Sequence, residues 1–423
     1  MQPHESIVQD TRNLSSELDQ QIHEECPRFS FPALLLRAGG QNEQLRMKLL
    51  EFVDVFPALH TGNEIKEHFL AYVRDIPPPR PILLRIAVGV MRIPFGGYVI
   101  AKCARKAIEI LAQHFIIKDG PFFKRIQDRY AREGATTVSD HLGELVVSEV
   151  EAKSMLKKYV HAMEQWGRKG QQFHIAIKFS ALFPYFCPEN QEESKRRVKD
   201  AFGIILEKAQ ETNSFVWVDA EHHHIQSLVE EIFLETICEH RFYSFTSVGI
   251  ALQAYLKDSS RRVERMVRIA RGRKNPFSVR LVKGAYWDTE VARALQRGWA
   301  IPVFRKKNLT DKNFNALLYF LLAHQKFIHV VPATHNPSNI AFAYCAAKKF
   351  GVVGKENFEF QILYGLGEPI RRVMLKRGFP VRVYMPIGDL VTGMSYFARR
   401  IIENTSNEGF LWQLMGKEKG GLS

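Results

Sequence analysis

The stretch VRLVKGAYWDTE, at positions 279–290, combines residue types that are costly to bury together. It begins like a buried strand with Val279 and other apolar residues, yet Arg280 and Lys283 interrupt the apolar run. Two cations at the end of a buried strand are unfavourable unless an anion meets them. Gly284 follows, and a glycine lets the backbone approach a ligand closely. The stretch therefore predicts a site for an anionic group.

A second cluster of cations lies near the C-terminus, in MSYFARRIIENTSNEGF at 394–410. Its apolar residues recur at helical spacing, so we expect a helix. Arg399 and Arg400 would present adjacent guanidinium groups, whose planar geometry suits a carboxylate. Arg399 and Glu403 are four residues apart, and an ordinary surface ion pair between them is the alternative.

Two histidine motifs also carry candidate chemistry. AEHHH at 220–224 looks like a metal site, but consecutive residues do not converge on one face of a helix or strand, and zinc sites on helices prefer i, i+4 spacing. We therefore expect a solvated loop and no metal site. His335, in ATHNP, is either structural or a hydrogen-bond donor to a cofactor.

The predicted secondary structure that positions these residues differs between the first 130 residues and the rest of the chain. Residues 1–130 show helical spacing, as in 33–59, with a stiff proline-rich connector at 74–81, and predict an all-helical N-terminal arm. Residues 131–412 alternate helical segments with short β-branched or aromatic runs, and 413–423 form a tail. The expected strands are ATTVSD (135–140), FHIAIKFSAL (173–182), SFVWVDAE (214–221), SVGIALQAY (247–255), FSVRLVKG (277–284), FIHVVPATH (327–335), FEFQILYG (358–365) and VRVYMPIG (381–388).

Eight strands alternating with helices, such as those expected at 191–211 and 227–240, predict an α/β fold of the (β/α)8 TIM-like barrel type. A doubly wound open sheet is the alternative. It would more often carry a glycine-rich fingerprint after its first strand, and GLGEP at 365–369 lacks the third glycine.

Polar residues gather where these strands end, and in a barrel all such ends lie on one face, where active sites form. Polar residues at strand ends that merely enter solvent are the alternative for any single position. The set is Asp140, Glu144, Lys178, Asp219, Glu221, Gln253, Arg280, Lys283, Thr334, His335, Asn336, Gln361, Glu368 and Tyr384.

Composition limits the class of protein. The 423 residues are 46% hydrophobic and 25% charged, as in soluble globular proteins. Five dispersed cysteines form no CxxC pair, and with no signal-peptide pattern they lead us to expect a reducing, cytoplasmic setting. The longest apolar region, 81–104, is broken by Arg85, Arg92 and Pro94, so we expect no membrane-spanning helix.

The net charge of +14 admits nucleic acid, anionic lipid or anionic small molecules as partners. The most basic stretch, RRVERMVRIARGRK at 261–274, has the spacing of an amphipathic helix with a basic outer face. No nucleic-acid-binding motif is present, so we expect no nucleic-acid partner. Peripheral contact with the inner face of a membrane stays open.

Several motifs together resemble the proline dehydrogenase family, in particular the proline dehydrogenase domain of bacterial proline utilisation A proteins. They are KFSAL, WVDAE, RLVKGAYWD, ATHNP, FEFQILYGLGEP, RVYMPIGD and YFARRIIEN, in that order between about Thr136 and Phe410. The region before them resembles, more weakly, the helical arm of those proteins. The ribbon-helix-helix and aldehyde dehydrogenase modules of some members are missing, so we expect a monofunctional enzyme or an isolated domain.

The resemblance implies non-covalent FAD and the oxidation of L-proline to Δ1-pyrroline-5-carboxylate by hydride transfer to flavin N5. Electrons would pass to a membrane quinone, and a separate pyrroline-5-carboxylate dehydrogenase would use the product. By motif position, Arg280 and Asp219 would be catalytic. Substrate would be held by Lys178, Tyr384, Tyr396, Arg399, Arg400, Glu403 and Glu144.

The same resemblance implies a FAD site in which Arg280 lies near N5 and Lys283 meets the pyrophosphate. The implied cofactor-binding residues are Gln253, Arg280, Lys283, Gly284, Ala285, Tyr286, Trp287, Thr334, His335, Asn336, Gln361, Tyr364 and Glu368. Two other classes of function stay open at this point. One is a flavin-free lyase with a Schiff base on Lys178 or Lys283, and the other is a basic scaffold protein.

Overall fold

The computed structural model describes residues 5–25, 48, 51–52, 55, 59, 61–74, 85, 88–89, 102, 106, 113–143, 146–167, 172–354, 358–365, 367–389, 393 and 396. The chain forms two compact units. The first comprises Met1–Glu24, Ile126–Leu363 and Gly367–Met385, and the second comprises Glu25–Arg125, Tyr364–Leu366 and Pro386–Ser423.

The first unit is built around eight strands in the order β6-β5-β4-β3-β2-β1-β8-β7. Parallel pairing joins the neighbours whose register is resolved, and a parallel bridge from Ala333 to Gln361 links the two ends of the sheet. The strands are β1 (Thr136–His141), β2 (Phe173–Ile177), β3 (Ser214–Val218), β4 (Val248–Gln253), β5 (Phe277–Val282), β6 (Ile328–Pro332), β7 (Phe360–Leu363) and β8 (Val381–Ile387). All eight overlap the segments predicted as strands, and the (β/α)8 barrel is confirmed. The predicted strand at 173–182 was too long, because Phe179–Ala181 form a 3-10 turn.

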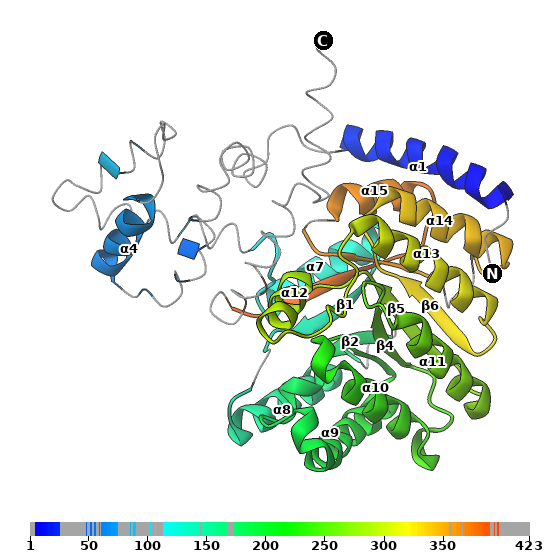
Figure 1. Ribbon diagram of the computed structural model, residues 1–423, viewed down its shortest axis with the longest axis horizontal. Coiled ribbons are helices and arrows are strands. Elements are labelled where there is room, and N and C mark those ends of the chain that lie inside the picture. The colour runs from blue at the N-terminus through cyan, green and yellow to red at the C-terminus, as the bar shows by residue number, and fades with distance from the viewer. Residues whose placement is uncertain are drawn as a thin grey trace, which may run out of the picture. The chain divides into compact units, whose positions relative to one another are not determined.

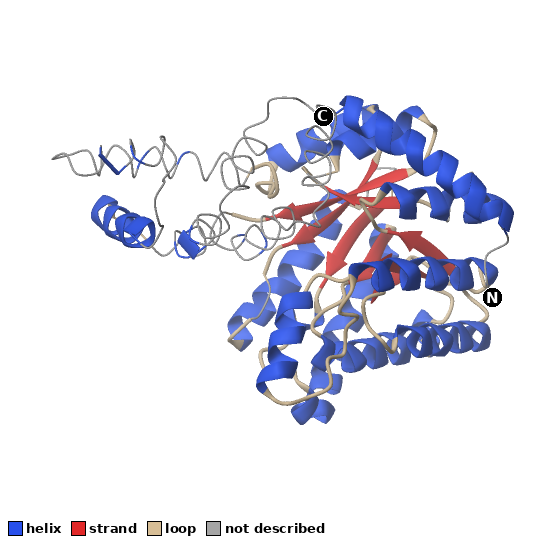
Figure 2. Ribbon diagram, turned by 45° about the horizontal axis from the view of Figure 1, so that its top comes forward, coloured by secondary structure: helices blue, strands red, loops and turns tan. Residues whose placement is uncertain are grey.

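Helices surround these strands, as Figures 1 and 2 show. They are α7 (Pro121–Arg132), α8 (Glu149–Trp166), α9 (Gln191–Thr212), α10 (His223–Ile237), α11 (Ser259–Arg273), α12 (Trp287–Gln296), α13 (Lys307–Ala323), α14 (Pro337–Lys349) and α15 (Glu368–Lys376). Short 3-10 turns occupy η2 (Phe179–Ala181), η3 (Pro188–Asn190) and η4 (His240–Phe242). The strands read as continuous apolar runs because helices cover the outside of the sheet while side chains fill its inside.

The N-terminal helix α1 (Glu5–Glu25) packs against the same unit (Figure 1). Arg377, after α15, donates hydrogen bonds of 2.8 Å to both Gln21 and Glu17. Ser15 and Ser338 share a hydrogen bond of 2.8 Å. Helix α1 is therefore tied to α14 and α15 by polar contacts.

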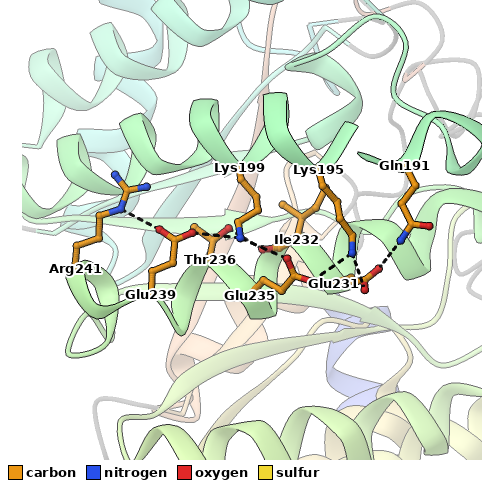
Figure 3. Close-up of polar contacts among 9 residues, drawn as sticks. All are labelled: Gln191, Lys195, Lys199, Glu231, Ile232, Glu235, Thr236, Glu239 and Arg241. Carbon is orange, nitrogen blue, oxygen red and sulfur yellow. Dashed lines mark hydrogen bonds and ion pairs between the residues drawn. The ribbon is translucent and has the colours of Figure 1, made fainter. Parts of the chain in front are cut away.

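Helices α9 and α10 carry a row of ion pairs between their facing surfaces (Figure 3). Lys195 lies 2.8 Å from Glu231, and Lys199 lies 3.4 Å from both Glu235 and Glu239. These side chains are partly exposed, so solvent screens each pair and the individual contribution is about 0.2–1 kcal/mol. The row favours one alignment of the two helices, and apolar burial supplies most of their stability.

Helix α11 confirms the amphipathic helix expected at 261–274, but its basic residues do not all face outward. Arg262 is buried and pairs with Glu230 at 3.0 Å and Asp258 at 2.8 Å. Arg273 is 1% exposed and donates hydrogen bonds to backbone carbonyls. The expectation of a purely basic outer face is wrong for these two, because each finds acceptors that replace water.

In the second unit, the described residues include helix α4 (Gly62–Arg74) and a cluster of Phe52, Leu59 and Ile65. Most of the helical stretch at 33–59 and all of 75–81 in the predicted connector lie outside the described residues. Within the part of the chain that is described, none of the helices combines the length and apolar character needed to cross a bilayer.

Candidate active site

The carboxyl ends of the strands bring a set of charged side chains together inside the barrel. Lys178 follows β2 directly and Asp219 follows β3, so each leaves its strand at the same end of the sheet. The members contributed by β1, β5, β7 and β8 are Asp140, Arg280, Gln361 and Tyr384. The prediction that Lys178, Asp219, Arg280, Gln361 and Tyr384 share one face is consistent with this arrangement.

Lys178 is held between two carboxylates. Its Nζ donates a hydrogen bond of 2.8 Å to Asp140 Oδ1 and lies 3.4 Å from Asp219 Oδ2. Lys178 is 6% exposed and Asp140 is 2% exposed. Burial on this scale is tolerated because the charges are paired.

Arg280 is fixed from several sides. One guanidinium nitrogen pairs with Asp219, and another donates a hydrogen bond of 3.2 Å to Gln361 Oε1. The rings of Trp217 and Tyr384 each lie with their centroids 5.1 Å from its central carbon. Asp219 is therefore an anion that meets Arg280 within the protein itself.

Burial raises the pKa of two neighbouring side chains. Burial raises the pKa of Asp140, although the Lys178 ammonium opposes this. Burial, and then the Asp140 and Asp219 carboxylates, raise the pKa of Tyr384 well above its usual range. Tyr384 accordingly stays protonated, and its hydroxyl donates a hydrogen bond of 2.6 Å to Asp219 Oδ2.

A supporting layer lies behind Gln361. Its amide nitrogen donates a hydrogen bond of 3.1 Å to Glu359, which also accepts one of 2.7 Å from Arg382. Arg382 donates in addition to the backbone carbonyl of Thr137 at 2.9 Å. Glu359 therefore fixes the amide orientation that leaves Gln361 Oε1 facing Arg280.

The loop after β5 leads from Lys283 to Trp287. Lys283 is half-buried and pairs with Asp311 on α13. Gly284 has φ +135°, and a Cβ there would lie 2.5 Å from the ring of Tyr255, so no other residue fits without movement. Ala285 and Trp287 are exposed, and the Tyr286 ring lies 4.2 Å from the His222 ring, centroid to centroid, with the planes tilted by 41°.

The histidines at 222–224 contact side chains of α12. His222 Nδ1 lies 3.2 Å from Glu290, and the His223 amide donates to the same carboxylate at 2.9 Å. Burial opposes ionisation of Glu290, but these hydrogen bonds outweigh it and lower its pKa. Among the described residues no group of three metal-ligating side chains is placed to hold an ion.

The remaining predicted cofactor residues have partners of their own. Gln253 donates to the Glu221 carbonyl at 2.9 Å. The Thr334 hydroxyl accepts from the Asn336 amide, and the Asn336 side chain caps α14. His335 Nε2 accepts a hydrogen bond of 3.0 Å from the Leu363 amide.

Two further members lie at α15 and its approach. Glu368 pairs with Arg371 at 2.9 Å and accepts a hydrogen bond from the Tyr130 hydroxyl. The Tyr364 hydroxyl donates to the Gln113 carbonyl at 3.4 Å. Tyr396 is buried, whereas Glu144, Arg399, Arg400 and Glu403 lie outside the described residues. The roles assigned to all these residues stay predictions.

Sequence reasoning gave no role to three residues that support the network. Asp140 was recognised only as a polar residue at a strand end, and Trp217 and Glu359 were not singled out. Strand alternation carried the signal for Trp217, because residues two apart share a face and Asp219 points inward. The pairing of Asp140 with Lys178 joins residues 38 positions apart and required the tertiary structure.

A family model described as Proline dehydrogenase matches residues 122–413, which spans the barrel and this network. The chain belongs to the proline dehydrogenase family. A second model, described as Proline utilization A N-terminal domain, matches residues 5–115.

Individual proteins of this family are similar in sequence to this chain. The Bifunctional protein PutA of Escherichia coli (strain K12) is 29% identical over 331 residues, which cover 75% of this chain and 25% of that protein. Proline dehydrogenase 2 of Bacillus subtilis (strain 168) is 27% identical over 286 residues, covering 68% of this chain and 84% of that protein. The chain thus spans about a quarter of the length of such PutA relatives.

A solved structure shares the fold. The crystal structure of proline utilization A from Bdellovibrio bacteriovorus, inactivated by N-propargylglycine, superposes with a TM-score of 0.87 at 30% identity. It covers 99% of this chain and 43% of that one. Proline utilization A of Bradyrhizobium japonicum, at 24% identity and a TM-score of 0.76, shows the same fold.

Proposed function

We propose that this chain oxidises L-proline to Δ1-pyrroline-5-carboxylate with non-covalently bound FAD and passes the electrons to a membrane quinone. Family membership supports the reaction class. The observation that carries the proposal is the buried network in which Asp219 joins Lys178, Arg280 and Tyr384 at the carboxyl end of the barrel. A pyrroline-5-carboxylate dehydrogenase would use the product.

The residues present fit FAD in charge and in space. Arg280 is a buried cation at the barrel mouth, and Lys283 is a half-buried one in the loop that follows. Gly284 has a positive φ and lies against the ring of Tyr255, a position that suits only glycine, and such a glycine would let the loop backbone approach a phosphate. An anionic ligand at Lys283 would join or replace the contact with Asp311.

When bound, FAD would supply the two-electron acceptor. The protein's own work would be to place a proline carbon–hydrogen bond against it. Lys178, with Arg399 and Arg400, would bind the carboxylate, and Tyr384 would pack against the ring carbons. Asp219 would fix the positions of the Lys178 and Arg280 side chains, and the amine proton would leave to solvent.

The other proposed roles follow the positions of the residues along the chain. Tyr396, Glu403 and Glu144 would close the substrate side. The cofactor side would be formed by Gln253, Lys283, Gly284, Ala285, Tyr286, Trp287, Thr334, His335, Asn336, Gln361, Tyr364 and Glu368. Of these, Lys283 would meet the pyrophosphate, and Arg280 would favour negative charge on the bound ring.

A Schiff-base lyase is disfavoured by the surroundings of Lys178. A lysine nucleophile must be neutral to attack a carbonyl. Two carboxylates within 3.4 Å of Nζ stabilise the ammonium instead.

One spectroscopic experiment tests the proposed function. The purified chain, as isolated or after incubation with FAD, should be yellow, and anaerobic L-proline should bleach the flavin bands while D-proline does not. An artificial electron acceptor should then support turnover. A colourless protein that takes up no FAD and does not turn over proline would overturn the proposal, and borohydride trapping of a carbonyl substrate on lysine would favour the lyase.

A further inference from the structure

Trp217 is a buried aromatic residue inside the barrel that has no role in the proposed reaction. Trp217 lies on β3 two residues before Asp219, so both side chains point inward. It is 1% exposed and belongs to a buried cluster with Val138, Ala176 and Phe215, against which Tyr384 packs. Its ring therefore lies in the layer directly beneath the charged network.

The Trp217 ring packs against the backbone of Gly249 on the neighbouring strand. A Cβ added to Gly249 on β4 would lie 2.5 Å from Cζ3 and 2.7 Å from Cε3 of Trp217. The indole therefore occupies the space that a side chain at Gly249 would need. A tryptophan seated this closely has little freedom to change its rotamer.

The polar edge of the indole is anchored as well. Trp217 Nε1 donates a hydrogen bond of 3.3 Å to His174 Nδ1, and His174 Nε2 lies 3.2 Å from Gln172 Oε1. His174 also stacks on Phe215, with ring centroids 4.6 Å apart and planes 9° apart. Burial, together with Arg382 and Arg280, lowers the pKa of His174 well below its usual range, which keeps Nδ1 available as an acceptor.

The face of the same indole meets Arg280. Its centroid is 5.1 Å from the guanidinium carbon, and the Tyr384 ring is at the same distance. An aromatic face attracts a cation, and the attraction is stronger where water is excluded. Strand β3 and the residue after it thus contact Arg280 in two ways, by the Trp217 ring and by the Asp219 carboxylate.

We propose that Trp217, seated against Gly249 and anchored by His174, is a positioning residue that fixes the Arg280 guanidinium and thereby sets the reduction potential of the bound flavin. This role rests on the proposed function. It needs no contact between Trp217 and substrate or cofactor, because Arg280 transmits the effect.

The test is the flavin midpoint potential of the full chain, measured anaerobically by dye titration. Trp217→Phe keeps a ring but loses the Nε1 hydrogen bond, and Trp217→Leu loses the ring. We expect the two-electron reduction equilibrium to shift about tenfold toward oxidised flavin in Trp217→Phe, which is about 30 mV, and further in Trp217→Leu. Proline KM should stay within about twofold, while kcat falls with the potential.

A double-substitution cycle separates positioning from a general loss of packing. In an Arg280→Lys background the planar guanidinium is gone, so Trp217→Phe should leave the potential where Arg280→Lys alone puts it. Phe233→Leu is the matched control, because Phe233 is a fully buried ring on α10 that packs against Phe202 and Phe277 and away from Arg280. It should lower stability without moving the potential.

Gly249→Ala provides a second route to the same end should Trp217→Leu fail to fold. It crowds the indole without replacing any side chain of the network, and it should shift the potential in the same direction. A yellow protein whose potential ignores both Trp217→Phe and Gly249→Ala would overturn this role alone. An equal shift in the Arg280→Lys background would overturn it too, whereas a colourless wild-type chain would overturn the proposed function and this role with it.

Discussion

At the scale of single residues, the chemistry proposed for this chain depends on opposite charges kept close inside a barrel. Asp219 is shared by Lys178, Arg280 and Tyr384, so its removal would take one partner from each of these three side chains. Such a network fixes geometry more than it stabilises the fold.

The proposed carboxylate clamp can be tested at Arg400. Arg400→Met should raise proline KM at least tenfold and leave FAD bound, because a charge-assisted contact is worth about 1.5–3 kcal/mol. Arg268→Met, which alters an exposed arginine of α11, is the control and should leave KM as it is. Unchanged kinetics in Arg400→Met would remove that arginine from substrate binding.

His174 gives a prediction about pH and stability. Its pKa in the folded chain is lowered, so below its ordinary value of about 6.5 the unfolded chain binds more protons than the folded one. Stability is therefore fully present above that pH and is lost as pH falls toward the folded-state pKa.

His174→Gln should flatten this dependence by up to about 1.4 kcal/mol per pH unit, even if it lowers stability at neutral pH. Urea unfolding between about pH 5 and pH 7 measures the slope. His224 and His329, whose pKa values are also lowered, remain in both proteins and cancel. Parallel profiles for the wild type and His174→Gln would contradict the assignment, and His240→Gln at an exposed histidine serves as control.

At the scale of elements, the eight strands and their order as β/α units were predictable from sequence because buried parallel strands are apolar runs bounded by polar residues. The contacts between side chains inside the barrel were not predictable in this way. Trp217 and His174 are 43 positions apart and meet only once β2 and β3 pair in register, Ala176 opposite Trp217. The close contact between Gly249 and the Trp217 ring likewise depends on the packing of β4 against β3.

Buried arginines were the other feature that sequence reasoning missed. Basic residues at helical spacing normally face water, and nothing local distinguishes Arg273 from its exposed neighbours. The structure places its guanidinium among the carbonyls of Ile237, Phe242 and Phe245, at 2.9, 2.7 and 2.5 Å. It also donates to the carbonyls of Asn275 and Pro276. Arg273 therefore joins the ends of α10, η4 and α11 to the start of β5.

Arg273→Leu should lower the free energy of unfolding by about 3 kcal/mol or more, because several buried carbonyls would lose their donor at about 1–3 kcal/mol each. Arg268→Leu removes an equal charge from the exposed face of the same helix and should change stability by about 0.5 kcal/mol or less. Urea titration of both variants gives the comparison. Equal losses would mean that the carbonyl contacts of Arg273 contribute little.

At the scale of the whole molecule, the net charge of +14 meets a local concentration of cations beside exposed apolar groups. Residues 291–309 hold five arginines and lysines and no acid. Leu295 and Trp299 in the same stretch are 67% and 55% exposed, and the Arg297 guanidinium lies 4.8 Å from the Trp299 ring. Cations beside exposed tryptophan and leucine suit a surface of anionic lipid, where a quinone acceptor would reside.

We therefore expect the chain to cosediment with vesicles that contain phosphatidylglycerol at low salt and to be released at about 1 M salt, where the Debye length falls to about 3 Å. Phosphatidylcholine vesicles should retain much less. The charge-reversed pair Arg297→Glu and Arg305→Glu should lose most of the binding, because each cation contributes about 1 kcal/mol near such a surface.

The matched control reverses Arg265 and Arg268, two exposed arginines of α11, and makes the same change in net charge. If this control loses as much binding as the first pair, then total charge and not the 291–309 surface governs attachment. If the unaltered chain stays in solution with anionic vesicles at low salt, electrons must leave by a route that does not need the protein to dock on lipid. Because both variants leave the barrel interior untouched, flavin content and bleaching by proline should be equal in all three proteins. Any loss of vesicle binding would then be a property of the surface.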